Sequence, residues 1–212
     1  MYRQLGFCKL KTKETTLGRG YLQKALLLDS TDVPSLEYMV LIHLANKDYD
    51  KALETQDRLI IQDTTDGFRF FEKGNIYRDK GHVFMAIKEY EKAIKKEYVG
   101  PDIYKEYGKA MIAGKWYRQG IDTLNKGVMS FGLNVDYESF DALGNAYFSI
   151  GQTDSALSCY QTSLKIYLQD EYLLMHFYKS LEMCYSKLGN TRKAEGMVQN
   201  IMNMETSSPG VS

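Results

Sequence analysis

Histidine and cysteine have the widest chemical range of the side chains in this chain of 212 residues. A zinc site needs several such side chains at short, regular spacings, and a nucleophilic cysteine needs a base beside it. The three histidines are widely separated, with no cysteine or carboxylate at zinc-like spacing around them: His43, His82 and His176. The three cysteines are an odd number at no metal-ligand spacing, so we interpret them as buried free thiols: Cys8, Cys159 and Cys184.

Other catalytic patterns are missing from the sequence as well. A phosphate-binding glycine loop follows a strand, and the composition predicts no strands; no nucleophile motif occurs. We therefore expect a chain that is not an enzyme and that needs no cofactor and no metal. The glycines are better explained as helix-packing residues.

The charges are balanced, with 27 Lys and Arg against 27 Asp and Glu. No global field would attract nucleic acid, and runs such as 88–92 alternate in sign, which is typical of a solvated helix face. No signal peptide is recognisable, and no apolar run reaches the length needed to cross a bilayer. We expect no nucleic-acid partner and no membrane insertion, with a cytoplasmic location as the default.

The elements that must carry any site are helices. Hydrophobic residues make up 44% of the chain and charged residues 25%, while only three prolines interrupt stretches rich in helix-forming residues. The predicted fold class is all-α.

An internal repeat organises these helices. Segments 73–81 and 143–151 share glycine, asparagine, tyrosine and glycine at the same offsets. A second pattern follows each segment at helical spacing: Ala86, Tyr90 and Ala93 after the first, and Ala156, Tyr160 and Ser163 after the second. Each repeat is therefore predicted to be two helices.

Two columns of residues extend the register along the chain. The first-helix column reads Gly6, Val40, Gly74, Gly108, Gly144 and Glu182; the second-helix column reads Gly18, Ala52, Ala86, Gly120, Ala156 and Ala194. Small residues at these places let two helices approach closely. The intervals are 34, 34, 34, 36 and 38 in both columns, which gives five repeats and a truncated one. We expect the two extra residues before the fifth repeat in a loop at 131–134, and the four before the last to lengthen a helix near 164–168 or near Tyr172 by one turn.

This pattern resembles the tetratricopeptide repeat, most specifically at Leu143, Gly144, Tyr147, Gly151, Ala156 and Tyr160. The resemblance implies a right-handed α-α superhelix, a solenoid of about 12 helices. Departures from the motif are Val40 and Glu182 in place of glycine, and Lys115 in place of a turn glycine.

The register divides the chain into an array over 1–204 and a disordered C-terminal tail over 205–212. The repeats are placed at about 1–32 (truncated), 33–66, 67–100, 101–136, 137–174 and 175–204. The pattern starts within a repeat, so the protein either starts with a short helix or is a fragment of a longer array; we favour the fragment.

In arrays of this family the first helix of each pair lines the inner groove, where ligands usually lie. The resemblance therefore implies a groove for a protein or peptide partner, with these candidate contacts: Phe71, Asn75, Arg78, Lys105, Lys109, Asn145, Phe148 and Lys179. The two asparagines are equally well explained as ligand contacts, since an amide can donate to and accept from a peptide backbone, or as residues that the position merely tolerates. Phe68 and Phe71 are alternative apolar anchors, and at least one of them is expected between helices.

The predicted function is a binding scaffold or adaptor that presents this groove. Two alternatives remain open at this point. One is a signal-sensing regulatory part of a larger protein whose effector domain lies elsewhere, and the other is a structural protein that self-associates through uncapped ends.

Overall fold

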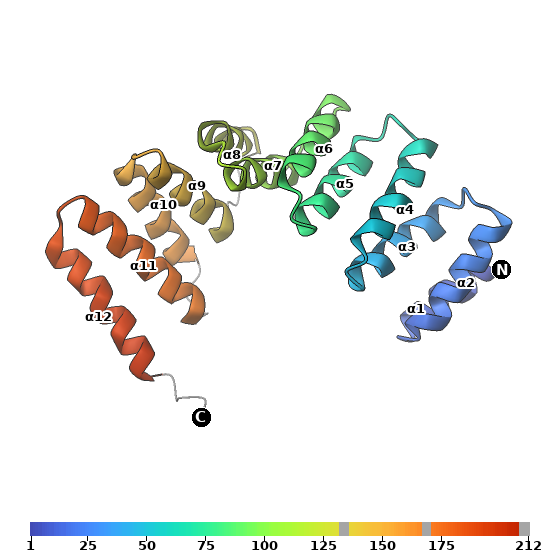
Figure 1. The fold of residues 1–212 in the computed structure, drawn as a ribbon, viewed down its shortest axis with the longest axis horizontal. Helices are drawn as coiled ribbons and strands as arrows, with labels where there is room; N and C mark the ends of the chain where they lie inside the picture. The colour runs from blue at the N-terminus through green and yellow to red at the C-terminus, as the bar shows by residue number, and fades with distance from the viewer. Residues whose placement is uncertain (132–135, 167–170, 208–212) are drawn as a thin grey trace. The chain divides into compact units, whose positions relative to one another are not determined.

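The computed structural model of the chain describes residues 1–131, 136–166 and 171–207. Within these residues it contains twelve α-helices and no strand, and consecutive helices form antiparallel hairpins (Figure 1). The predicted all-α class built from helix hairpins is confirmed. The chain divides into two compact units, Met1–Val99 and Gly100–Ser212, each with its own run of three hairpins.

Unit 1 consists of α1 (Tyr2–Lys11), α2 (Thr15–Leu28), α3 (Val33–Ala45), α4 (Tyr49–Gln62), α5 (Gly67–Asp79) and α6 (Val83–Lys95). Its core is continuous from hairpin to hairpin, because side chains from successive helices are buried together: Leu36 and Val40 of α3, Ala52, Leu53 and Leu59 of α4, and Ile76 of α5. No hairpin could bury this apolar surface alone, so stacking supplies the stability.

Unit 2 consists of α7 (Pro101–Ala113), α8 (Tyr117–Phe131), α9 (Tyr137–Ser149), α10 (Thr153–Ile166), α11 (Glu171–Lys187) and α12 (Thr191–Ser207). Two buried clusters hold it together. One joins Ile121 and Leu124 of α8 to Leu143 of α9, and the other joins Tyr160 of α10 to Leu181 of α11.

The glycine columns act at helix crossings, as the register predicted. A methyl group added at Gly74 would lie 2.5 Å from Cε1 of Tyr90, and one at Gly144 would lie 2.6 Å from Cε1 of Tyr160. At Gly108 it would lie 2.6 Å from Cγ of Leu124. Each glycine therefore creates the space that a large side chain of the partner helix fills.

The turn inside each hairpin contains one residue in the left-handed region, with φ between 57° and 83°: Lys13, Lys47, Gly81, Lys115, Gly151 and Gly189. The following amide closes the helix end by reaching back over the turn, as when His82 N donates to Tyr77 O at 2.8 Å. Lysine adopts this conformation in three turns, although glycine would do so at lower cost.

The helix bounds refine the predicted repeat boundaries. The expected starts at 33, 67, 101 and 137 coincide with the first residues of α3, α5, α7 and α9. The expected start at 175 lies inside α11, which begins at Glu171 and has 17 residues, so the lengthened helix is the one near Tyr172. The predicted disordered tail is wrong at its start, because α12 continues to Ser207, and residues 208–212 lie outside the described residues. Of the loop expected at 131–134, Phe131 is the last residue of α8, and 132–134 lie outside the described residues.

Candidate functional site

A hollow of about 370 Å³ lies on unit 1 between α3 and α5, with α4 beneath them. Its apolar side chains come from all three helices: Val40, Leu41 and Leu44 of α3, Leu59 of α4, and Phe68 and Ile76 of α5. Leu41 is 59% exposed and Phe68 is 39% exposed, whereas Val40, Leu59 and Ile76 are core residues. The hollow therefore has a fixed apolar floor and two accessible apolar side chains at its edge.

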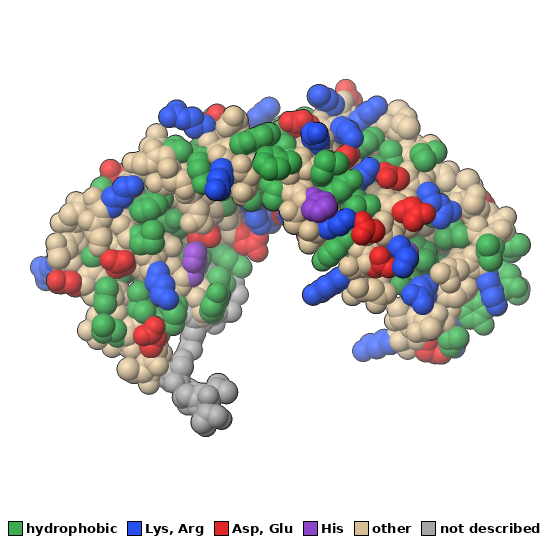
Figure 2. Space-filling view, viewed as in Figure 1, with side chains coloured by type: hydrophobic (Ala, Val, Ile, Leu, Met, Phe, Trp, Pro, Cys, Tyr) green, Lys and Arg blue, Asp and Glu red, His purple; other side chains and the backbone are tan. Residues whose placement is uncertain are grey.

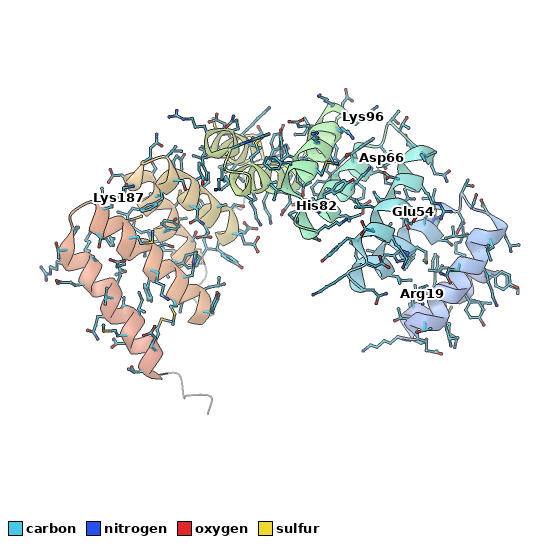
Figure 3. All side chains as sticks on the ribbon, in the orientation of Figure 1. Arg19, Glu54, Asp66, His82, Lys96 and Lys187 are labelled. Carbon is cyan, nitrogen blue, oxygen red and sulfur yellow. The ribbon has the colours of Figure 1, made fainter. Side chains whose placement is uncertain are left out.

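The polar lining of the hollow is Glu37 of α3, Gln56 of α4, and Arg69, Glu72, Asn75 and Asp79 of α5. Arg69 is the central cation. Its guanidinium forms a short ion pair with Glu37 of the preceding first helix and lies 3.4 Å from both Glu72 and Asp66, and its side chain is only 15% exposed. Asp66, at the start of α5 (Figure 3), also caps that helix by accepting from Phe68 N at 2.9 Å.

Gln56 supports this network from below. It is fully buried, and its Nε2 donates to Arg69 O at 2.8 Å and to Glu72 Oε2 at 3.3 Å. Burial raises the pKa of the Glu72 carboxyl, although Gln56 and Arg69 act in the opposite direction. The hollow thus holds more carboxylates than one guanidinium can neutralise.

The candidate asparagines have a structural partner in both units. Asn75 Oδ1 accepts from the Tyr90 hydroxyl at 2.8 Å, and Asn145 Oδ1 accepts from the Tyr160 hydroxyl at 2.8 Å. Each tyrosine ring lies on the glycine that precedes the asparagine, so Gly–Asn on one helix and Tyr on the other form one packing device. Asn75 also lines the hollow, whereas Asn145 is exposed on α9.

The phenylalanine candidates are separated by the structure. Phe71 is 8% exposed, and its ring contacts Tyr90 and Tyr98 at centroid distances of 5.8 and 5.1 Å. Its placement in the groove is therefore corrected: Phe71 is a core residue because α5 turns it toward α6. Phe68 is the accessible ring of the two, and it lines the hollow. Arg78 lies beside the hollow, where it pairs with Asp79 at 2.7 Å and donates to Asn75 Oδ1 at 3.2 Å.

The lysine candidates of α7 form ion pairs with the next first helix of unit 2. Lys105 Nζ lies 2.6 Å from Asp136, which caps α9, and Lys109 Nζ lies 2.6 Å from Glu138. The bond to Asp136 raises the pKa of Lys105. Burial alone would raise the pKa of Asp136, but the bonds from Lys105 and Ser139 hold it below its ordinary value. These lysines therefore link two successive repeats by ion pairs within the chain itself.

A second polar link joins α9 to α11. Asp141 accepts from Asn145 Nδ2 at 3.2 Å and contacts His176 Nε2 at 2.9 Å, and this bond raises the pKa of His176. Farther along these helices, Phe148 lies under Lys187, whose Nζ is 4.4 Å from the ring centroid; Lys187 lies at the end of α11 (Figure 3). Lys179 is exposed and forms no ion pair with another described residue.

The groups considered for catalysis remain separate. No group of three or more metal-ligating side chains gathers in the part of the chain that the structure describes. Cys159 and Cys184 lie inside unit 2, where burial raises the pKa of each thiol to about 11, so both are protonated near neutral pH and poor nucleophiles. Cys8 is exposed, which corrects the interpretation of all three as buried. Among the described residues, no helix is both long and apolar enough to span a bilayer.

Sequence reasoning missed the residues that define the hollow of unit 1, namely Glu37, Leu41, Gln56, Arg69 and Glu72. Leu41 and Asn75 occupy the same register position, 34 residues apart, so the candidate column could have been extended into the second repeat. Gln56 was a further signal, because it is a polar residue within the buried face of α4. Acidic and basic side chains are interspersed over the face of unit 1 seen in Figure 2. The balanced charge of the whole sequence therefore gave no sign of where the hollow lies.

Comparison with known proteins agrees with this architecture. A family model described as tetratricopeptide repeat matches residues 70–95 and 137–170, which include the two segments with the Gly–Asn–Tyr device. The search of curated proteins finds no match.

Solved structures with this fold include the following three, all of low sequence identity to this chain. A repeat protein from Parabacteroides merdae is 12% identical, covers 98% of this chain and 79% of its own, and has a TM-score of 0.77. MamA from Desulfovibrio magneticus RS-1 is 15% identical over 86% of this chain and 98% of its own, with a TM-score of 0.75. YrrB, described as having an unusual peptide-binding site, is 18% identical over 88% of this chain and 93% of its own, with a TM-score of 0.71.

At these identities the solved structures establish the fold alone. The family match adds the sequence motif, and the glycine crossings explain why that motif produces these hairpins. Residues 70–95 and 137–170 thus match the tetratricopeptide repeat, and the helix hairpins of the chain have the fold of tetratricopeptide repeat proteins.

Proposed function

We propose that this chain is a binding module for a peptide or protein segment, and that the hollow between α3 and α5 is its principal contact surface in unit 1. The observation that carries the proposal is the hollow itself: about 370 Å³, with an apolar floor, the exposed side chains Leu41 and Phe68 at its edge, and polar groups beside them. Concave sites of this size and composition are typical of ligand binding. The fold generally serves protein–protein interaction, and the similar protein YrrB is described as binding a peptide.

In unit 2 the proposal assigns the partner-facing surface to the first helices α7, α9 and α11. Lys105, Lys109, Asn145, Phe148 and Lys179 remain its candidate contacts. Since Lys105 and Lys109 already form ion pairs, a ligand carboxylate would have to compete with Asp136 and Glu138. Lys179 has no such competitor among the described residues, so it is the strongest cationic candidate.

The experiment is a selection of peptides from a random display library on the full chain, followed by affinity measurement with synthetic copies of the selected peptides. Leu41→Ser removes the exposed apolar side chain at the edge of the hollow without adding a charge, and we expect it to weaken binding at least tenfold. Ile61→Ser is the matched control, because Ile61 is a similarly exposed apolar residue of α4 outside the hollow, 76% exposed.

Equal binding by the wild-type chain and the Leu41→Ser variant would remove the hollow from the proposal. In that case the double variant Asn145→Ala, Lys109→Glu tests the surface of unit 2 with the same peptides. Unchanged binding by this variant as well would contradict the assignment of binding to the first helices.

A further inference from the structure

The lining of the hollow in unit 1 contains more hydrogen-bond acceptors than donors. Three of its lining residues are carboxylates, Glu37, Glu72 and Asp79, against one lining cation, Arg69. Asp79 is paired with Arg78 next to it, which leaves Arg69 to serve Glu37 and Glu72, together with Asp66 at the helix start. One guanidinium shared by three carboxylates leaves excess negative charge at this place.

A second, independent observation is an orphaned acceptor in the wall. Gln56 is fully buried, and its Nε2 donates both of its hydrogen bonds, to Arg69 O and to Glu72 Oε2. Its Oε1 has no hydrogen-bond partner in the part of the chain that the structure describes. Gln56 therefore has no donor to spare for a ligand or for Glu37, and it adds to the surplus of acceptors around the hollow.

The apolar part of the hollow limits the shape of that occupant. Leu41, Leu44 and Phe68 offer aliphatic and aromatic surface next to the carboxylates of Glu37 and Glu72. A small hydrated cation would leave this apolar surface exposed to water. A purely apolar side chain would offer the carboxylates no hydrogen-bond donor. Arginine and lysine combine a long aliphatic stem with a cationic donor head, which matches both parts.

We infer that the hollow between α3 and α5 recognises a protein segment through a basic anchor side chain, arginine in preference to lysine. The stem of the anchor lies on Leu41 and Phe68, and its head donates to Glu37 and Glu72. Arginine is preferred because its planar fork can serve two carboxylates at once. This inference rests on the proposed function and specifies the chemistry of the ligand.

The test uses the peptides selected on the full chain from the random display library. We expect the selected sequences to be enriched in arginine or lysine next to an apolar residue. Replacing the anchor arginine by citrulline keeps its shape and removes its charge, and we expect this change to weaken binding about tenfold. Raising the salt concentration from 0.05 to 0.5 M, a range chosen for the assay, should weaken the arginine peptide and leave the citrulline peptide nearly unaffected.

Variants of the protein locate the effect. Glu37→Gln and Glu72→Gln should each reduce affinity for the arginine peptide several-fold and bring it closer to that of the citrulline peptide. Glu54→Gln, an exposed carboxylate of α4 outside the hollow (Figure 3), is the control for net charge and should leave binding unchanged. Thermal unfolding of every variant identifies any loss of affinity that follows from unfolding, and Glu37→Gln is the decisive variant because Glu37 is the more exposed of the pair.

The outcomes separate the two proposals. Peptides that lose affinity with Leu41→Ser but are acidic or purely apolar, or that bind equally with citrulline, would overturn the basic anchor and leave the peptide-binding function in place. Peptides whose affinity Leu41→Ser does not change would overturn the function proposed for the hollow itself.

Discussion

The link from α3 to α5 in unit 1 and the link from α7 to α9 in unit 2 join equivalent first helices by opposite electrostatic arrangements. In unit 2, two lysines of α7 each meet a different carboxylate of α9, Lys105 with Asp136 and Lys109 with Glu138, and Glu106 of α7 lies 3.9 and 4.0 Å from the two lysines. In unit 1, the position equivalent to Lys105 two repeats earlier is Glu37, and the single cation Arg69 is shared among several carboxylates.

This difference shows how one scaffold can carry two surfaces. The backbone positions are set by the repeat, whereas the sign of the charge at one register position decides whether the link between helices is satisfied within the chain. Where each carboxylate of the next first helix has a lysine of its own, there is little demand for a ligand cation. One guanidinium shared among several carboxylates leaves such a demand.

The scaffold itself should respond alike in the two units. Gly74→Leu and Gly144→Leu both force a side chain into the ring of the facing tyrosine, and we expect each to lower the free energy of unfolding by about 3 kcal/mol. Urea denaturation measures the loss. Gly196→Leu in α12 is the control, because an added Cβ there meets nothing within 4 Å. A Gly144→Leu variant as stable as the wild-type chain would break the assigned register.

The linking cations should respond differently, which tests the comparison directly. Arg69→Gln leaves several carboxylates facing one another at a side chain that is only 15% exposed, so we expect a loss of about 2 kcal/mol. Lys105→Gln removes one partly exposed pair and should cost under about 1 kcal/mol. Equal losses in urea denaturation would contradict the distinction between one cation shared by several carboxylates and a separate lysine for each carboxylate of α9.

The hairpin turns allow a smaller, reciprocal exchange. Lys115 has φ 66° and Gly151 has φ 82° at equivalent positions. Lys115→Gly should raise the free energy of unfolding by up to about 1 kcal/mol, because glycine adopts the left-handed conformation without strain, and Gly151→Lys should lower it by about as much. Thermal melts of the two variants check this, and changes of the same sign would rule out backbone strain as the cause.

The smallest expected effect is a pH dependence confined to unit 2. The pKa of His176 is raised by Asp141, so the folded chain holds this proton more tightly than the unfolded chain does. The resulting stability is fully present below the unfolded pKa of about 6.5 and is lost as the pH rises through the higher folded pKa. We expect the wild-type chain to exceed Asp141→Asn in stability by a few tenths of a kcal/mol more at pH 5.5 than at pH 8.5, since the pair is partly exposed. These two pH values are chosen for the assay. If the stability difference between the two chains is the same at both, the His176–Asp141 pair does not cause a pH dependence.

Much of the scaffold was predictable because its signals are local and repeated. Spacing placed Gly74 and Gly144 at helix crossings, and the first residues of four helices coincide with predicted repeat boundaries. The candidate contacts were less accessible to this reasoning. Phe71 is turned into the core while Phe68, three residues earlier, lies at the edge of the hollow, and both suit the same amphipathic pattern.

The sequence by itself determined the helix hairpins, their length and their order, because small residues at fixed intervals allow only one kind of close helix crossing. Only the tertiary structure decided which side chains are already engaged. Lys105 meets Asp136 across 31 residues, and Gln56 meets Arg69 across 13. Such partners are chosen by the stacking of one hairpin on the next, which brings residues from different helices within hydrogen-bonding distance and leaves others, such as the edge of the hollow in unit 1, open to a ligand.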